Sequence, residues 1–115
     1  MALALNIFKT ETKIATLTPS TVYVAPVGYT GVILLAQVTN IDPNTTYEVS
    51  FSHQRTKSGI AITTEIVKDY PIPPREASNL LFGKMVLESN DKLLLSSNNS
   101  GNNIKLILSI LETLN

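Results

Sequence analysis

The residue best suited to acid–base chemistry in this 115-residue chain is its single histidine, His53. It ends an alternating segment whose apolar side consists of Tyr47, Val49 and Phe51. Catalysis at such an imidazole requires a serine, a carboxylate or a metal ion held against it, and no motif in the sequence marks a partner. We therefore interpret His53 as a packed or half-exposed histidine at the end of a strand.

Metal ligation has equally few candidates. The chain contains no cysteine, so a site would depend on one imidazole and on oxygen ligands. Asp42 with Asn44, and Asn90 with Asp91, place pairs of oxygen side chains in short turns that could contact Ca²⁺. Such pairs more commonly stabilise the turn itself. We expect no metal, no cofactor and no catalytic residues, and hence a protein that is not an enzyme.

Charge and hydropathy restrict the class of partner. Nine basic side chains balance nine acidic ones and are scattered along the chain, so the basic stripe of a nucleic-acid binder is missing. A net charge of zero does not oppose self-association. No apolar run approaches the roughly 20 residues of a membrane span, and residues 1–5 lack the features of a signal peptide. We expect a soluble protein that binds neither nucleic acid nor membrane.

Two kinds of binding chemistry remain. Residues 53–57 form a basic strand tip and Arg75 follows a proline segment. Arg55 and Arg75 could therefore anchor a partner at the rim of an interface, or they could belong to solvated loops. The tyrosines Tyr23, Tyr29 and Tyr70 could instead form a sugar platform, although the chain has no tryptophan. The two sequons, at Asn44 and Asn98, carry little meaning without a secretory signal.

Turn residues divide the chain into short segments with strand character. We expect strands at residues 13–17, 22–25, 30–40, 47–54, 62–67, 84–88, 92–96 and 104–111. The proline-rich residues 70–74 should cross between sheets, because proline interrupts helices and central strands. Residues 76–81 could form one helical turn, and residues 84–96 are expected to form a hairpin around residues 89–91. Residues 104–111 also fit a helical stripe, but their strict alternation favours a strand.

Seven or eight short antiparallel strands predict a single all-β domain, a β-sandwich of the jelly-roll or immunoglobulin-like kind. The sandwich is expected to span residues 13–115. Residues 1–12 would form an N-terminal arm or edge segment, with residues 1–10 apolar enough to dock on a neighbour. A domain of this length buries roughly two-thirds of its surface without disulfides.

The strand at residues 32–38 is apolar on both faces. One face can pack on the core of a two-layer protein, so the other needs a cover, such as a neighbouring subunit. We expect Ile33 and Leu35 to form the subunit contact, with Tyr23, Tyr29, Arg55 and Arg75 around it. The expected core consists of Val32, Leu34, Ala36, Val38, Tyr47, Val49, Phe51, Ile104, Leu106 and Leu108.

The order of phrases in the sequence resembles small virion structural proteins of tailed bacteriophages, especially phages of marine cyanobacteria. The phrases are VYVAPVGYT (22–30), LAQVTN (35–40), FSHQR (51–55), EIVKDYPIP (65–73), LFGKMVLESND (81–91) and LILSILET (106–113). The resemblance covers about residues 14–113. One departure is the segment 73–76, where two prolines precede Arg75 and a glycine-containing turn would be expected.

This resemblance implies a non-enzymatic β-sandwich that is a component of a virion and is assembled in the host cytoplasm. Its first expected role is capsid decoration or cement, and the alternative is a neck, tail or fibre-attachment accessory. The expected partners are copies of the chain, for which a trimer would be an ordinary arrangement, and other virion proteins such as the major capsid or tail proteins. A host-surface carbohydrate-binding module is the alternative from another class.

Overall fold

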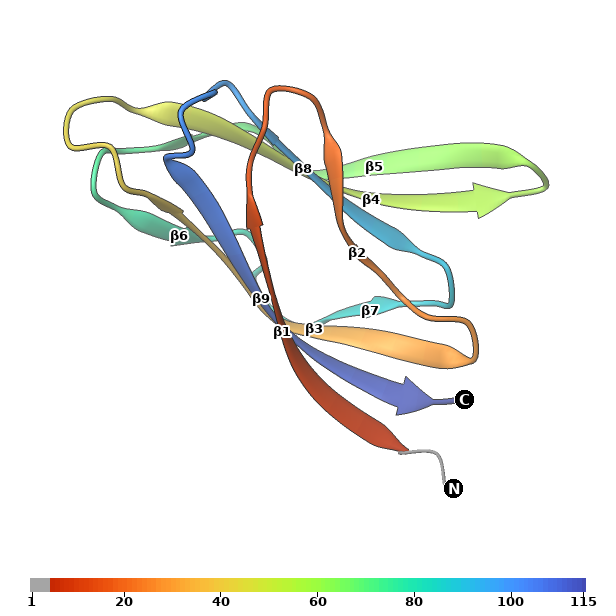
Figure 1. Cartoon of the computed structure of the whole chain (residues 1–115). Coiled ribbons are helices and arrows are strands. Elements are labelled where there is room, and N and C mark those ends of the chain that lie inside the picture. The colour runs from red at the N-terminus through yellow and green to blue at the C-terminus, as the bar shows by residue number, and fades with distance from the viewer. Residues whose placement is uncertain (1–4) are drawn as a thin grey trace.

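The computed structural model describes residues 5–115, which contain nine β-strands and no helix. The strands are β1 (Asn6–Ile14), β2 (Ser20–Val24), β3 (Tyr29–Asn40), β4 (Tyr47–Lys57), β5 (Ile60–Ile72), β6 (Ala77–Asn79), β7 (Met85–Leu87), β8 (Lys92–Ser97) and β9 (Ile104–Leu114). Every pairing is antiparallel. The strands form two layers, as Figure 1 shows. The predicted β-sandwich is thereby confirmed.

The order of the strands identifies the kind of sandwich. One sheet has the order β1-β9-β3-β6, with β7 also paired to β3, and the other has the order β2-β8-β4-β5. The chain passes from one sheet to the other after most strands, and the first strand lies beside the last. This arrangement of two interlocked Greek keys is the jelly roll. Of the two sandwich types expected, the structure therefore has the jelly roll.

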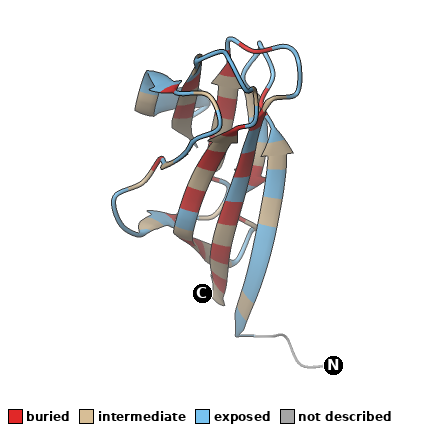
Figure 2. Ribbon diagram, turned by 90° about the vertical axis from the view of Figure 1, so that its left-hand side faces the viewer, coloured by how far each residue is buried: buried red, intermediate tan, exposed pale blue. Residues whose placement is uncertain are grey.

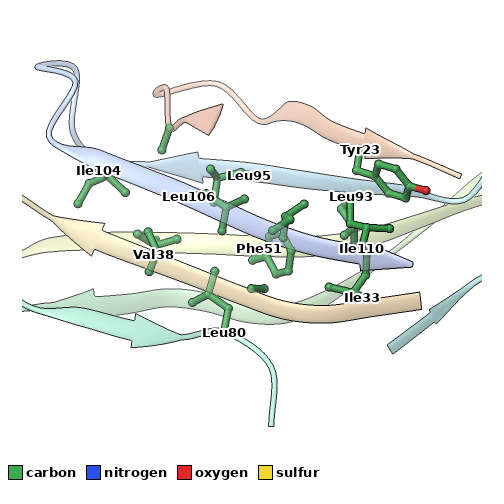
Figure 3. Close-up of a cluster of buried hydrophobic side chains, with 14 of the residues drawn as sticks. Tyr23, Ile33, Val38, Phe51, Leu80, Leu93, Leu95, Ile104, Leu106 and Ile110 are labelled. Carbon is green, nitrogen blue, oxygen red and sulfur yellow. The ribbon is translucent and has the colours of Figure 1, made fainter. Parts of the chain in front are cut away.

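The core lies between the two sheets and is built from alternate residues of their strands. Figure 3 shows side chains from both sheets meeting in this layer, among them Phe51, Leu93 and Ile110. Seven of the ten predicted core residues are buried, and Tyr47 packs against them. These seven residues are Ala36, Val38, Val49, Phe51, Ile104, Leu106 and Leu108.

A β-bulge in β3 corrects the prediction for the other two core residues. Ile33 pairs with Ile110 and Leu35 pairs with the next residue, Ser109, so Leu34 is an extra residue in β3. A bulge of one residue reverses which side chains face inward. Ile33 is consequently fully buried, whereas Val32 and Leu34 are only half-buried. The expectation that Ile33 contacts another subunit is wrong for this reason.

Three other expectations about elements are also corrected. The first strand is β1, which begins earlier than the predicted strand at residues 13–17 and pairs with β9 along its whole length. Residues 1–4 of the expected arm lie outside the described part of the chain. Residues 77–79 form β6 rather than a helical turn. The predicted hairpin at residues 84–96 is wrong, because β7 pairs with β3 while β8 pairs with β2 and β4 in the opposite sheet.

The last element is a strand, as its alternation predicted. β9 lies between β1 and β3, and its residues alternate between buried and less buried positions up to Glu112. Figure 2 shows this banding along the central strands and a largely exposed β1 at the edge. This alternation identifies which side chains of the sheet point away from the core.

Candidate functional site

An apolar row crosses the outward-facing side of the five-stranded sheet. Phe8 on β1 is opposite Leu111 on β9, Leu111 is opposite Val32 on β3, and Val32 is opposite Val86 on β7. Residues directly opposite each other in an antiparallel pair point to the same side. All four therefore point away from the core, and Phe8 and Val86 are 74% and 59% exposed. We call these four residues, together with Leu35, the outer apolar row.

Leu35 lies next to this row because of the bulge in β3. Its partner on β9 is Ser109, whose neighbour on β1 is Thr10. The extra residue Leu34 lines a shallow hollow of about 290 Å³ together with Phe8 and Thr10. The expectation that Leu35 lies on an outward apolar face agrees with its exposure of 36%. Sequence reasoning missed Phe8, Leu111 and Val86, since only strand pairing brings them together.

Tyr23 is not part of any surface. Its side chain is buried, and its hydroxyl donates a 2.5 Å hydrogen bond to Oε2 of Glu112, which also lies 3.5 Å from Nζ of Lys9. Burial raises the pKa of the Tyr23 phenol well above its usual range, and the bond to Glu112 raises it further. A Cβ atom on Gly31 would lie 3.0 Å from the Tyr23 hydroxyl. Tyr23 therefore links the two sheets and needs a glycine beside it.

The other two tyrosines of the predicted sugar platform lie in opposite sheets. Tyr29 is half-buried at the start of β3, while Tyr70 is exposed near the end of β5 in the opposite sheet. With Tyr23 buried between the sheets, the three tyrosines do not form the single platform that a sugar ring would need. The structure therefore does not support a sugar-binding platform formed by Tyr23, Tyr29 and Tyr70.

The side chain of Arg55 forms ion pairs and hydrogen bonds with carboxylates of its own chain. Its Nε donates to Oδ1 of Asp91 at 2.9 Å, and a second nitrogen donates to Oδ2 at 2.6 Å. The guanidinium also lies 2.8 Å from a carboxylate oxygen of Glu88, which is largely exposed. Two-point pairing of this kind fixes the orientation of the arginine. We therefore assign Arg55 a structural role at the end of β4.

Asp91 is the centre of this cluster, and it also contacts the single histidine. Nε2 of His53 lies 3.0 Å from Oδ2 of Asp91, and the backbone N–H of Glu88 donates to the same oxygen at 2.9 Å. Hydrogen bonds from Arg55 hold the pKa of Asp91 well below its usual range, and those from His53 and Glu88 lower it further against the opposing effect of burial. The carboxylate is thus a charged acceptor whose contacts are all internal, and His53 is a packed residue.

Arg75 lies far from this cluster in the chain, in the turn between β5 and β6. It is exposed and adopts a left-handed backbone conformation with φ of 61°. That conformation is the one glycine adopts most easily. The turn therefore has the geometry expected of a glycine, although an arginine supplies it. Of the six predicted contact residues, the structure places Leu35 alone in the outer apolar row.

The side chain of Asp42 stabilises its own turn through hydrogen bonds. Oδ1 of Asp42 accepts from the N–H groups of Asn44 and Thr45, and Oδ2 accepts from the hydroxyl of Tyr47. The backbone bond from Asn44 is the main reason why the pKa of Asp42 is lowered. Within residues 5–115, no group of three or more His, Cys, Asp or Glu side chains could hold a metal ion. The same part of the chain contains no helix long and apolar enough to cross a membrane.

Comparisons with known proteins locate the fold but not a family. No protein-family model matches the chain, and no curated protein matches it in sequence. A chain of the T13 viral particle of IBDV aligns over 96% of this chain with a TM-score of 0.55 and 8% identity. A chain of infectious bursal disease virus, Gt strain, also aligns over 96%, with a TM-score of 0.46 and 12% identity, and supports no conclusion about the fold.

The chain spans 31% of the length of each of these two viral chains. At 8% identity, the first alignment establishes a shared fold and nothing further about this protein. Neither structure adds support to the resemblance to proteins of tailed bacteriophages.

Proposed function

We propose that this protein is a non-enzymatic structural component of a virus particle that docks on the particle through its outer apolar row. The observation that carries the proposal is the exposure of that row on a jelly-roll sheet. Phe8 on β1, Leu35 on β3 and Val86 on β7 are exposed, and Leu111 on β9 completes an apolar surface over four adjacent strands. An exposed contiguous apolar surface on a folded domain is typical of an interaction site.

Two further observations support a virion as the setting. The jelly roll is a fold used by viral capsid domains, although lectins and other proteins use it too. The structure that aligns with a TM-score of 0.55 is a chain of a viral particle. The resemblance of the phrases quoted above to small virion proteins of tailed bacteriophages implies the same class. We therefore propose capsid decoration or cement in a tailed phage as the specific role, with the major capsid protein as partner.

A neck, tail or fibre-attachment role is the second candidate. It asks for the same sandwich and the same apolar contact, and it differs in the number of copies per particle. The carbohydrate-binding alternative is weaker, because Tyr23 is buried and Tyr29 and Tyr70 belong to different sheets.

Imaging of the intact particle at side-chain resolution tests the proposal. We expect this chain on the shell in many copies, with the outer apolar row facing the underlying capsid protein. A few copies at the neck or tail would establish the accessory role instead. Absence of the chain from the particle would overturn the virion proposal as a whole.

A double variant, Leu35→Ser with Val86→Ser, tests the contact surface itself. Loss of two apolar side chains from a buried contact costs about 2–3 kcal/mol, which corresponds to a roughly 50-fold weaker attachment. The matched control is Val27→Ser, because Val27 is an exposed valine in the turn before β3, outside the row. Attachment of purified variants to particles lacking the protein should fall for the double variant and stay constant for the control. Equal attachment of both would exclude this face.

A further inference from the structure

The β4–β5 hairpin extends beyond the rest of its sheet and leaves one long strand edge free. β8 pairs with β4 only from Val49 to Gln54, whereas β4 and β5 remain paired to the turn at Ser58 and Gly59. Figure 1 shows the hairpin projecting past β8. β5 is the last strand of its sheet, so its other side carries no strand from the described part of the chain. An isolated two-stranded hairpin is marginally stable in water, so this one would gain from a further strand.

The other sheet edges carry features that oppose strand addition. β6 and β7 are three residues long, and β2 has five residues and a bulge. β1 directs Lys9, Glu11 and Lys13 toward the core side of its sheet, as their pairing with buried residues of β9 shows. Short edges, bulges and inward-pointing charges are the usual means by which proteins block edge-to-edge association.

β5 has such protection only from Ile66 onward, because Ile66 is itself an extra, bulged residue opposite the step from Phe51 to Ser52 in β4. Lys68, the left-handed residue Asp69 and Pro71 all lie toward its end. The first half, residues 60–65, has the sequence IAITTE, with β-branched residues at four of six positions and one charge. Ile60 and Ile62 are 66% and 51% exposed. This half combines strand propensity, exposure and an open edge.

The tight turn determines which backbone groups of β5 face outward. In a two-residue hairpin the flanking residues, here Lys57 and Ile60, form a hydrogen-bonded pair, and the pairs then alternate. The alternation directs the N–H and C=O groups of Ala61, Thr63 and Glu65 away from β4. The backbone groups of these three alternate residues can therefore form hydrogen bonds with another strand.

We propose that the free edge of β5 pairs with the same edge of a second copy of this chain. In an antiparallel pair centred on Thr63, each Thr63 is opposite its equivalent, and Ala61 is opposite Glu65 of the second copy. The pair between these two sets Ile62 against Thr64 of the second copy. The two Glu65 carboxylates are thereby kept apart, and each exposed Ile62 gains the β-branched Thr64 as its neighbour.

This self-complementary register is the reason for choosing a second copy over an unrelated partner. A two-fold contact requires one patch to complement itself, and residues 61–65 do so in both side-chain pattern and charge. The contact shares no residue with the outer apolar row and does not depend on the virion role. A chain absent from every particle would still be expected to form this dimer.

Substitutions at Thr63 test the pairing in the purified full chain. Thr63→Pro removes an outward N–H donor while leaving the ladder to β4 intact, since proline is tolerated where the N–H faces solvent on an edge strand. Thr63→Val keeps the N–H and strand propensity. Sedimentation velocity should show a concentration-dependent dimer for wild type and Thr63→Val, and a folded monomer for Thr63→Pro. A wild-type chain that stays monomeric, or a Thr63→Pro chain that still dimerises, would overturn the proposal.

A cysteine cross-link tests the register independently. Because the chain has no cysteine, Thr63→Cys would introduce a single thiol, and the Cα separation in a hydrogen-bonded pair, about 5.5 Å, permits a disulfide. Under a mild thiol oxidant we expect a covalent dimer in high yield from Thr63→Cys. Thr46→Cys, in an exposed loop, is the control for random collision. Equal yields from the two variants would refute the Thr63-centred pairing.

Discussion

Asp91 connects three separate parts of the chain through one residue. Its carboxylate accepts from Arg55 and His53 on β4, and its backbone carbonyl accepts from the N–H of Ala25. The side chain is 2% exposed, while that of Arg55 is 37% exposed. The cost of burying the carboxylate is thus offset by several charge-assisted hydrogen bonds. The cluster stabilises the end of the sandwich from which the β4–β5 hairpin projects.

Removal of this carboxylate should therefore destabilise the domain. Asp91→Ala leaves Arg55 without its main partner and opens a buried polar hole, for which we expect a loss of about 3 kcal/mol in the free energy of unfolding. Glu88→Ala is the control, because Glu88 pairs with the same arginine from an exposed position and should change stability by less than about 1 kcal/mol. Urea unfolding followed by circular dichroism measures both. Similar losses for the two variants would contradict a central role for Asp91.

At the scale of elements, the bulge in β3 explains why the predicted inward and outward faces are exchanged for residues 32–34 and correct for residues 35–38. Residues 32–36 are all apolar, so their pattern contains no information about which side chains face inward. Ala36 and Val38 were placed correctly because they follow the bulge, and Ile33 was misplaced because it precedes it. The bulge itself is fixed by pairing with β9, which is a tertiary contact.

Other elements could be predicted from the sequence where their own residues alternate clearly between apolar and polar. β4 and β9 alternate clearly between apolar and polar residues, and both were identified as strands with the correct core side. β7 and β8 were found as strands, but their assignment to opposite sheets depends on pairing with distant strands. The outer apolar row was out of reach for the same reason, since Phe8 and Val86 become neighbours of β3 and β9 only in the assembled sheet.

The bulge makes a sharp prediction about deletions in β3. Deleting Leu34 should restore regular alternation while keeping Ile33 opposite Ile110 and Leu35 opposite Ser109, so the chain should fold with a loss of about 1 kcal/mol or less. Deleting Gln37 instead shifts the residues on one side of the deletion by one position along β9. Core side chains in the shifted part of β3 would then face solvent. Thermal unfolding should remain cooperative for the first variant and be lost or strongly lowered for the second. The reverse order of stability would show that the bulge is required.

At the scale of the whole molecule, the two proposed contacts are geometrically compatible. Antiparallel strands in one continuous sheet are related by a two-fold axis perpendicular to that sheet. Pairing of two β5 edges would therefore place both five-stranded sheets on the same side of the joined sheet. Both outer apolar rows would face one direction, and a dimer could use both of them on a single surface. The trimer expected from the sequence remains a prediction that sedimentation distinguishes from this dimer.

Bivalent docking through the proposed dimer would make the β4–β5 hairpin important for attachment, because the hairpin would hold two outer apolar rows together. Once one outer apolar row is bound, the second binds at a high effective concentration, and this avidity amounts to roughly a 100-fold gain in overall affinity. Thr63→Pro should therefore reduce retention on the particle by about that factor on dilution, although Leu35 and Val86 are unchanged. Thr63→Val should be retained like wild type, and copies per particle before and after dilution can be counted by quantitative mass spectrometry. If a monomeric Thr63→Pro chain were fully retained on the particle, bivalent docking would be excluded. A chain that had lost a second bound row would have to be released faster than wild type.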